Sequence, residues 1–246
     1  MDGNNRWARA RNLSARDGHL QGARTAKRII NACVQRKVPC LTLFAFSTEN
    51  WSRPTREVFS LMALFVTVLK HKEVQKLDEA NVRIRIVGNR SGFSTRLQAR
   101  MKRAETLTRN NTGTTVIVAA DYGGRWDIVQ AAQKIAHEVE QGSLRLEDID
   151  ESKLHANMAL AEFPDPDLCI RTGGEIRLSN FLLWHFAYTE FYFSDCYWPD
   201  FGAAELDRAL RDYARRRRHF GGRKLEEVPQ AAPSPGGAPS KQEMCE

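Results

Sequence analysis

The sequence predicts an α/β fold, a single domain with a mostly parallel central sheet flanked by helices. Short apolar runs alternate with longer amphipathic segments, which is the pattern of βαβ units. The chain has 246 residues, 42% of them hydrophobic, which is enough for one sizeable core. From residue 226 onward the sequence is rich in Pro, Gly and Ser and has no hydrophobic period. We therefore expect a domain over residues 1–225 and a disordered tail over residues 226–246.

The first elements follow from hydrophobic spacing. Apolar side chains recur at helical spacing in Gly18–Lys37, which predicts an amphipathic helix that stops before Pro39. Leu41–Phe46 is apolar on both faces, as expected of a central strand between two helical layers. Phe59–Leu69 is apolar around most of its circumference and is predicted to be the next helix.

The second half of the chain continues the alternation. Val82–Val87 alternates apolar and basic residues, which predicts a strand with one face outside the core. The last helix, Ala203–Phe220, is expected to stop at Gly221–Gly222. The elements between them are predicted to be strands at Thr114–Ala120, Leu168–Arg171 and Phe191–Phe193 and a helix from about Arg125 to Glu140. Ligands of such sheets bind beyond the carboxyl ends of the strands, so a site is expected in the loops there.

Composition excludes several classes of protein. No window approaches the roughly 18 apolar residues of a membrane span, and no apolar segment follows the basic N-terminus as in a signal peptide. Five cysteines without a Cys-x-x-Cys pair argue against a disulfide framework and a zinc ribbon, and favour a cytoplasmic location. The common nucleotide-binding and zinc-protease motifs are absent. The net charge of +7 favours an anionic partner.

A first polar cluster comprises residues 2–7, DGNNRW, together with Gly18 and His19 at a helix start. Small residues, helix-terminal amides, an arginine and a histidine suit a cradle for a diphosphate group. Asp2 could then hold a magnesium ion on that diphosphate. The alternative is an exposed turn with an isolated acid.

A second cluster, residues 47–54, directly follows the predicted central strand. Its polar groups, interleaved with Trp51 and Arg53, suit a mobile loop that closes on a charged substrate. The alternative is an ordinary helix start, in which Thr55 caps the next helix and Trp51 only packs against it.

A third cluster, residues 171–180, surrounds the turn at Gly173 and Gly174. Its two arginines and a hydroxyl can clamp a second diphosphate, because the guanidinium fork matches phosphate oxygens. Solvated turn arginines are the alternative. Glu190 is the one carboxylate in an aromatic stretch, and such a residue is more often at the surface unless it meets a metal.

A fourth basic run, Arg215–Arg218, could bind nucleic acid, but it ends a predicted helix. Positive charge is favourable at a helix C-terminus, so a solvated helix end is the preferred interpretation. We expect no nucleic-acid partner.

Five motifs, in this order and spacing, closely resemble those of the cis-prenyltransferase family, in particular its bacterial undecaprenyl diphosphate synthases. They are MDGNNRW, GH, FSTENWSRP, YGGRWD and RTGGEIRLSNFLLWHFAYTEFYF. The resemblance runs from Met1 to about Gly222. It implies a homodimeric α/β enzyme that uses magnesium to condense farnesyl diphosphate repeatedly with isopentenyl diphosphate, adding Z double bonds.

The product would be undecaprenyl diphosphate, the precursor of the lipid carrier for cell-wall glycans, and contact with the membrane would be peripheral. A cis-prenyltransferase of another product length, or a truncated inactive homologue, remains an alternative. A non-catalytic partner subunit would lack the Asp motif, which Asp2 and Arg6 preserve here.

The resemblance also implies roles for individual residues. Asp2 would be the essential acid that handles magnesium and diphosphate, Glu190 the second magnesium ligand, and Asn50 a helper in removing a proton from isopentenyl diphosphate. The allylic diphosphate would be bound by Gly3, Asn4, Asn5, Arg6, Trp7 and His19; the closing loop would contribute Ser47, Thr48, Glu49, Trp51 and Arg53; and isopentenyl diphosphate would be held by Arg171, Arg177, Leu178 and Ser179. The growing chain needs a dry tunnel, which Leu43, Leu61, Leu64, Phe65 and Val116 could line, although all five suit a plain core equally well.

The chain departs from the family pattern at several positions. Ala15 replaces an arginine, Asn5 a glycine, Asp121 an asparagine, Ile176 a histidine and His185 a glutamine. Family members also carry an apolar strand immediately before Met-Asp-Gly. We expect that strand in the centre of the sheet and hypothesise that the true start codon lies upstream.

Overall fold

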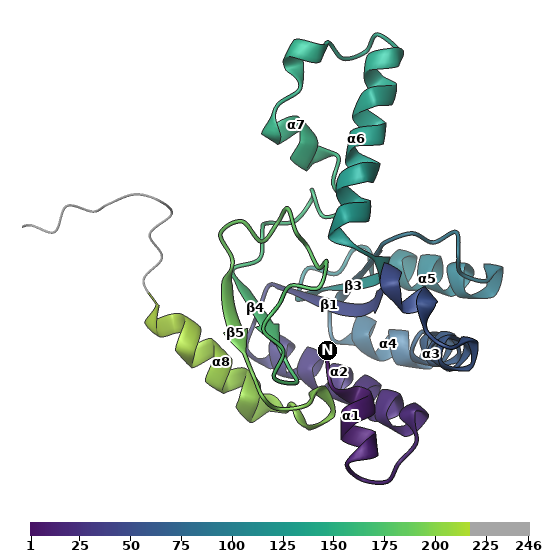
Figure 1. Ribbon diagram of the computed structural model, residues 1–246, viewed down its shortest axis with the longest axis vertical. Coiled ribbons are helices and arrows are strands. Elements are labelled where there is room, and N and C mark those ends of the chain that lie inside the picture. Colours follow the sequence, from purple (N-terminus) through teal and green to yellow (C-terminus); the bar gives the residue numbers. More distant parts are fainter. Residues whose placement is uncertain (217–246) are drawn as a thin grey trace, which may run out of the picture. The chain divides into compact units, whose positions relative to one another are not determined.

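A computed structural model describes residues 1–216 (Figure 1). The predicted tail and the predicted helix stop at Gly221–Gly222 lie outside these residues. The helices are α1 (Asn4–Arg9), α2 (Ala15–Gln35), α3 (Thr55–Val68), α4 (His71–Glu79), α5 (Thr95–Thr108), α6 (Gly124–Glu140), α7 (Glu151–Ala156) and α8 (Ala203–Arg215). The 3-10 helices of this part of the chain are η1 (Thr48–Ser52), η2 (Leu146–Asp148) and η3 (Trp198–Asp200). The strands are β1 (Cys40–Ser47), β2 (Arg83–Val87), β3 (Thr115–Tyr122), β4 (Leu168–Arg171) and β5 (Glu190–Phe193).

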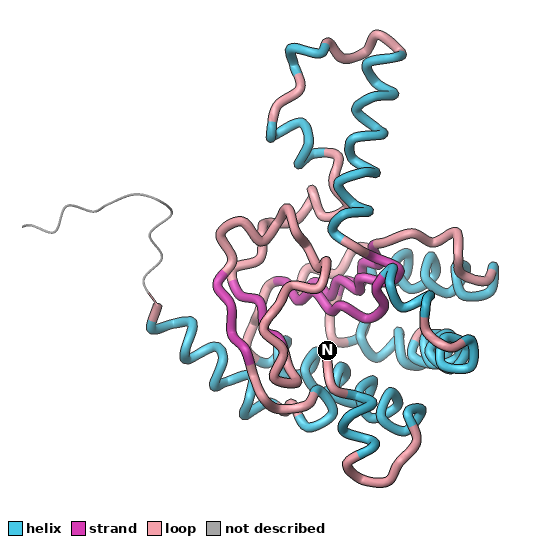
Figure 2. Tube along the Cα trace, in the orientation of Figure 1, coloured by secondary structure: helices cyan, strands magenta, loops and turns pink. Residues whose placement is uncertain are grey.

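The strand pairs in residues 1–216 are all parallel, which confirms the predicted fold class. The described strands form one sheet of order β1-β3-β2 and a second sheet of β4 and β5, with helices packed around them (Figure 2). The prediction that Leu41–Phe46 is a central strand is wrong within the described residues, because β3 lies between β1 and β2. Accordingly β3 is the most deeply buried strand, whereas β1 is largely half-buried.

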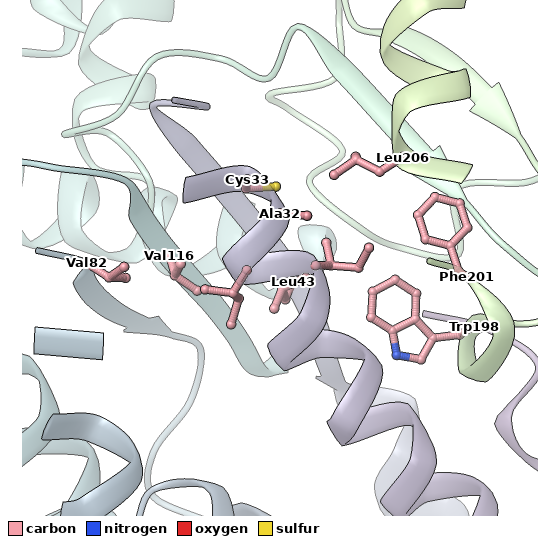
Figure 3. Close-up of a cluster of buried hydrophobic side chains, with 10 residues drawn as sticks. Ala32, Cys33, Leu43, Val82, Val116, Trp198, Phe201 and Leu206 are labelled. Carbon is pink, nitrogen blue, oxygen red and sulfur yellow. The ribbon is translucent and has the colours of Figure 1, made fainter. Parts of the chain in front are cut away.

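The larger sheet buries its two faces against different layers. On one face Leu43 of β1 and Val116 of β3 pack against Ile29 and Cys33 of α2 and against Trp198 (Figure 3). The neighbouring β2 extends the same face toward α4 and α5. On the other face Ile117 and Ala119 of β3 pack against the segment that includes Leu160, Leu182 and Phe186. This alternation along β3 is the two-residue period of a strand buried on both sides.

Helix α3 is apolar but not buried. Leu61 is its one buried residue, while Phe59 is 75% exposed and Val68 is 40% exposed. Phe65 lies against Phe46 and Phe93, with ring centroids 6.4 and 6.5 Å away. Because they are nine residues apart, Phe59 and Val68 lie on opposite sides of the helix, one near each end.

Helix α2 begins at Ala15, three residues before the predicted start at Gly18, because Ser14 caps it. The Ser14 side chain accepts from the backbone amide of Asp17, and the Asp17 carboxylate accepts from the Ser14 amide, so the two residues form a capping box. No helix in residues 1–216 is long and apolar enough to cross a membrane.

Candidate active site

Asp2 is fixed by its backbone. Its amide donates to Thr172 Oγ1 at 2.9 Å, the Thr172 hydroxyl donates to the Asp2 carbonyl at 3.0 Å, and the Trp198 amide donates to the same carbonyl at 2.9 Å. These bonds join the start of the chain to the carboxyl end of β4 and to η3. The carboxylate takes no part in them, and the side chain is 43% exposed.

Arg171, the last residue of β4, brings the first and third clusters together. Its Nη2 lies 2.8 Å from Asp2 Oδ2, while Nη1 donates to Ser179 Oγ at 3.0 Å and to the Arg177 carbonyl. The side chain is only 12% exposed, and its buried Nε has no hydrogen-bond partner within residues 1–216. One guanidinium thus holds the turn after β4 against Asp2.

Two more arginines of the predicted site meet at Glu175. Arg6 Nη2 lies 2.9 Å from Glu175 Oε1, and Arg177 forms an ion pair with the other carboxylate oxygen. Gly173 has φ +83°, and a Cβ there would lie 3.0 Å from Arg6 Nη2. Glycine at this turn therefore lets the Arg6 guanidinium approach the backbone.

The remaining residues of the first cluster shape α1. Gly3 has φ +100°, and a Cβ there would lie 2.5 Å from Tyr197 Cδ1. Asn4 lies against α2, where a Cβ at Gly22 would be 2.3 Å from Asn4 Oδ1. Trp7 donates to Asp200 Oδ1 at 2.7 Å, so its polar group is directed at η3. Asn5 lies in the same helix, α1, and is half-buried.

Glu57, which the sequence analysis did not select, connects the first and second clusters. His19 Nε2 lies 3.4 Å from Glu57 Oε1, and Arg53 Nη1 donates to the same oxygen at 2.9 Å. Burial lowers the pKa of His19, and the interaction with Glu57 opposes this. The spacing of Arg53 and Glu57, four residues apart, is a helix ion-pair signal that could have identified Glu57.

The second cluster forms η1 rather than an irregular loop. Asn50 Oδ1 accepts from the Ser47 amide at 3.0 Å, so its side chain closes the turn. Glu49 accepts from Asn180 Nδ2 at 2.6 Å, which joins the second cluster to the third. Burial favours the neutral form of Glu49, yet hydrogen bonds from Asn180, the backbone, Ser47 and Thr48 lower its pKa overall.

Trp51 contacts residues outside α3, the helix against which the alternative interpretation expected it to pack. Its ring lies 5.0 Å from that of Phe46 and 5.9 Å from that of Phe93, and Nε1 donates to Asp121 Oδ1 at 2.8 Å. The expected cap at Thr55 is wrong, because Thr55 is the first residue of α3 and Pro54 precedes it without a side-chain cap. The loop therefore contacts the end of β3 through Trp51.

Asp121 is a buried carboxyl, 3% exposed, at φ +52°. Burial raises its pKa, and the hydrogen bond from Trp51 opposes the shift. The folded state therefore binds a proton on the Asp121 carboxyl more tightly than the unfolded chain does. The protonated carboxyl contributes fully to folding stability below about pH 3.9, and this contribution is lost as the pH rises through the folded-state pKa. We expect Asp121→Asn to be more stable than the parent at pH 7 and to lose this advantage near pH 4, as measured by urea unfolding.

A matched control is Asp17→Asn, in the capping box of α2. Hydrogen bonds from the Ser14 side chain and amide lower the pKa of Asp17. Its stabilising contribution is present at neutral pH and is lost on acidification, so the variant is expected to show the opposite trend. An Asp121→Asn difference that did not change with pH would contradict the assignment.

The structure does not bring Glu190 to Asp2. Glu190 begins β5 opposite Leu168, whereas Arg171, the partner of Asp2, lies at the other end of the same ladder opposite Phe193. Three residues along a strand span roughly 10 Å. The Glu190 carboxylate instead lies 2.8 Å from Arg216 Nη1. Within one chain the expectation that Glu190 completes a metal site with Asp2 is therefore not supported.

The other predicted positions lie at the surface. Leu178 is partly exposed beside Arg177, and Ile176, which replaces the histidine of the family pattern, is 77% exposed. Of the basic run at the end of α8, Arg216 pairs with Asp212 and Glu190. Arg217 and Arg218 lie outside the described residues.

The chain is similar to known proteins over most of its length. The family model described as putative undecaprenyl diphosphate synthase matches residues 1–221. A farnesyl-diphosphate-specific ditrans,polycis-undecaprenyl-diphosphate synthase of Pseudomonas aeruginosa is 50% identical over 95% of this chain and 93% of its own. The enzyme of the same name from Escherichia coli K12 is 48% identical over 90% of this chain and 87% of its own.

Two solved structures share the fold. Lavandulyl diphosphate synthase from Lavandula x intermedia, in complex with dimethylallyl diphosphate, superposes with a TM-score of 0.86 at 40% identity over 90% of this chain and 95% of its own. A probable undecaprenyl diphosphate synthase from Campylobacter jejuni gives a TM-score of 0.72 at 33% identity over 82% of this chain and 92% of its own. This chain therefore belongs to the undecaprenyl diphosphate synthase family of cis-prenyltransferases, as its motifs predict.

Proposed function

We propose that this chain is a prenyltransferase that condenses farnesyl diphosphate with successive isopentenyl diphosphates, in cis, to give undecaprenyl diphosphate. The observation that carries the proposal is the contact of 2.8 Å between the Asp2 carboxylate and the Arg171 guanidinium at the carboxyl end of β4. Arg6 and Arg177 meet at Glu175, in the turn directly after this pair. Guanidinium groups and a reachable carboxylate are what two diphosphates in one pocket need.

Each condensation joins the allylic carbon of one substrate to the terminal alkene carbon of the other, releases diphosphate and removes one proton. Arg6 and His19 bind the allylic diphosphate in this proposal, and Arg171, Arg177 and Ser179 bind isopentenyl diphosphate. Glu175 keeps Arg6 and Arg177 oriented through ion pairs that a more highly charged diphosphate can replace. Positioned positive charge stabilises the departing diphosphate.

Asp2 fits the role of a magnesium ligand. Its carboxylate oxygens are hard donors, and the side chain is exposed enough to accept an ion that also keeps waters and diphosphate oxygens. Bound there, magnesium would act as a Lewis acid on the diphosphate. We assign the ion to Asp2 alone in this chain, because Glu190 is placed at the other end of β4 and β5.

The apolar face of α3 suits the growing hydrocarbon. Leu61, Leu64, Phe65 and Val68 follow the helical spacing of one face, and of these Val68 is 40% exposed. A prenyl chain that covered this face would remove the apolar surface from water. The remaining elements of the proposal are a homodimer, a cytoplasmic location, peripheral contact with the membrane and supply of the cell-wall lipid carrier. These follow from the family resemblance.

The test is incorporation of labelled isopentenyl diphosphate into butanol-extractable product, with farnesyl diphosphate and magnesium. We expect long-chain product, no product in excess chelator, and recovery when magnesium is restored. A ladder that stopped at short chains would indicate a cis-prenyltransferase of another product length. A folded chain that gave no product at any magnesium concentration would contradict the proposed activity.

A further inference from the structure

A group of metal-binding side chains lies outside the site described above. His155 is in the last turn of α7, Asp165 precedes β4, and His185 precedes β5. One ligand atom from each, an imidazole nitrogen or a carboxylate oxygen, lies within 4.8 Å of the other two. The three residues are far apart in sequence, so the fold rather than local spacing brings them together.

His185 is the centre of this group. Its side chain is 2% exposed, and its Nδ1 lies 2.8 Å from Asp165 Oδ1. The Asp165 oxygen therefore faces Nδ1, and an ion bound by both residues would take Nδ1 and replace the proton that the two atoms share.

The second imidazole is already oriented toward the first. The rings of His155 and His185 lie 5.3 Å apart, centroid to centroid, at an interplanar angle of 73°. Zinc ligands lie roughly 2.0–2.2 Å from the ion. Nitrogens and an oxygen within 4.8 Å of one another can therefore converge on one ion after small side-chain rotations. His155 is half-buried and Asp165 is 52% exposed, which leaves both free to make them.

The backbone around Asp165 is held in place for this contact. Asp165 lies between Pro164 and Pro166, and a residue that precedes proline is restricted to extended conformations. The Thr189 hydroxyl donates to the Pro166 carbonyl at 2.6 Å, which ties this turn to the segment that carries His185. A ligand that is already held in place loses less conformational entropy when it binds an ion.

We propose that His155, Asp165 and His185 bind a divalent transition-metal ion, with zinc the ion that two imidazoles and a carboxylate suit best. Three protein ligands leave a fourth position for water. Magnesium is excluded from this role because it requires oxygen ligands. The bound ion connects α7 to the segments that lead into β4 and β5. The proposal does not depend on the enzymatic activity.

The test is cobalt binding to the untagged full chain, first stripped of metal, in excess magnesium. Cobalt replaces zinc with the same ligands and is followed by its visible absorption. We expect one equivalent to bind and zinc to displace it. Loss of a group that only supports a ligand costs roughly 10–100-fold in affinity, so His155→Gln and His185→Gln, which remove ligands, are each expected to weaken binding at least that much.

The matched control is His137→Gln, an exposed histidine at the end of α6, which is expected to leave cobalt affinity unchanged. Asp165→Asn tests the carboxylate in the same titration. All of these variants keep the five cysteines, so cobalt held by thiolates would bind all of them equally and would overturn the proposal.

Folding is checked by circular dichroism and by thermal unfolding with and without zinc. Zinc is expected to raise the midpoint of the parent and of His137→Gln but not that of His155→Gln, because only a folded site binds the ion. If His185→Gln does not fold because that residue is buried, cobalt binding by His155→Gln still tests the proposal, since His155 is only half-buried. Absence of cobalt binding by the folded parent would leave the group a hydrogen-bonded Asp–His pair and would refute the site.

Discussion

Asp2→Ala is expected to reduce prenyl transfer by about 10²–10³-fold or more, the loss typical of removing one group that stabilises developing charge. The fold is expected to survive. Asp2 is anchored through its amide and carbonyl to Thr172 and Trp198, and alanine keeps both groups. The lost contact with Arg171 is partly exposed, so it contributes at most about 1 kcal/mol to stability, or roughly 2–4 °C in the unfolding midpoint.

Asp2→Asn is the matched control for charge. It preserves the size of the side chain and a carbonyl oxygen near Arg171, but it offers magnesium no anionic ligand. Initial rates of labelled isopentenyl diphosphate incorporation, measured over a range of magnesium concentrations, are expected to be low for both variants. If Asp2→Asn kept parental rates at saturating magnesium, the carboxylate would not be the ion's ligand.

The positions of most elements could be predicted from the sequence, because hydrophobic period is a local property. Strand β4 was predicted at its observed bounds, and β2 with its one exposed face was also recognised. The order of the strands in the sheet, by contrast, is not a local property of the sequence. Leu41–Phe46 is as apolar as a central strand, yet β3 occupies the centre, since pairing between β1, β2 and β3 depends on contacts distant in sequence.

In the candidate site, too, local features could be predicted from the sequence, whereas contacts between distant elements could not. Motif residues identified the three clusters, Asn180 among them, but not Glu57, which joins the first two clusters, nor the contact between Asn180 and Glu49, because both arise from packing between elements. Glu190 was assigned to the metal from its motif, and only the register of β4 and β5 shows that it begins the strand whose far end lies near Asp2. His185 was visible as a departure from the family pattern. Its partners His155 and Asp165 were not, because no spacing links them.

Arg171→Lys is expected to reduce activity about 10- to 150-fold, the equivalent of one hydrogen bond to a charged group at roughly 1.5–3 kcal/mol. Arginine uses two nitrogens in different directions here, Nη2 toward Asp2 and Nη1 toward Ser179 and the Arg177 carbonyl. Lysine retains the charge as a single ammonium and cannot reproduce the planar fork. The turn that carries Ser179 would then lose its tie to Asp2.

The loss should fall on the isopentenyl diphosphate side of the reaction if Arg171 holds that substrate. We therefore expect the KM for isopentenyl diphosphate to rise in Arg171→Lys while the KM for farnesyl diphosphate changes little. The matched control, Arg6→Lys, contacts Glu175 through a guanidinium that is 46% exposed, and its effect should fall on farnesyl diphosphate. Equal effects of both variants on both substrates would show that the two diphosphates share one set of arginines, because a common cluster cannot discriminate between them.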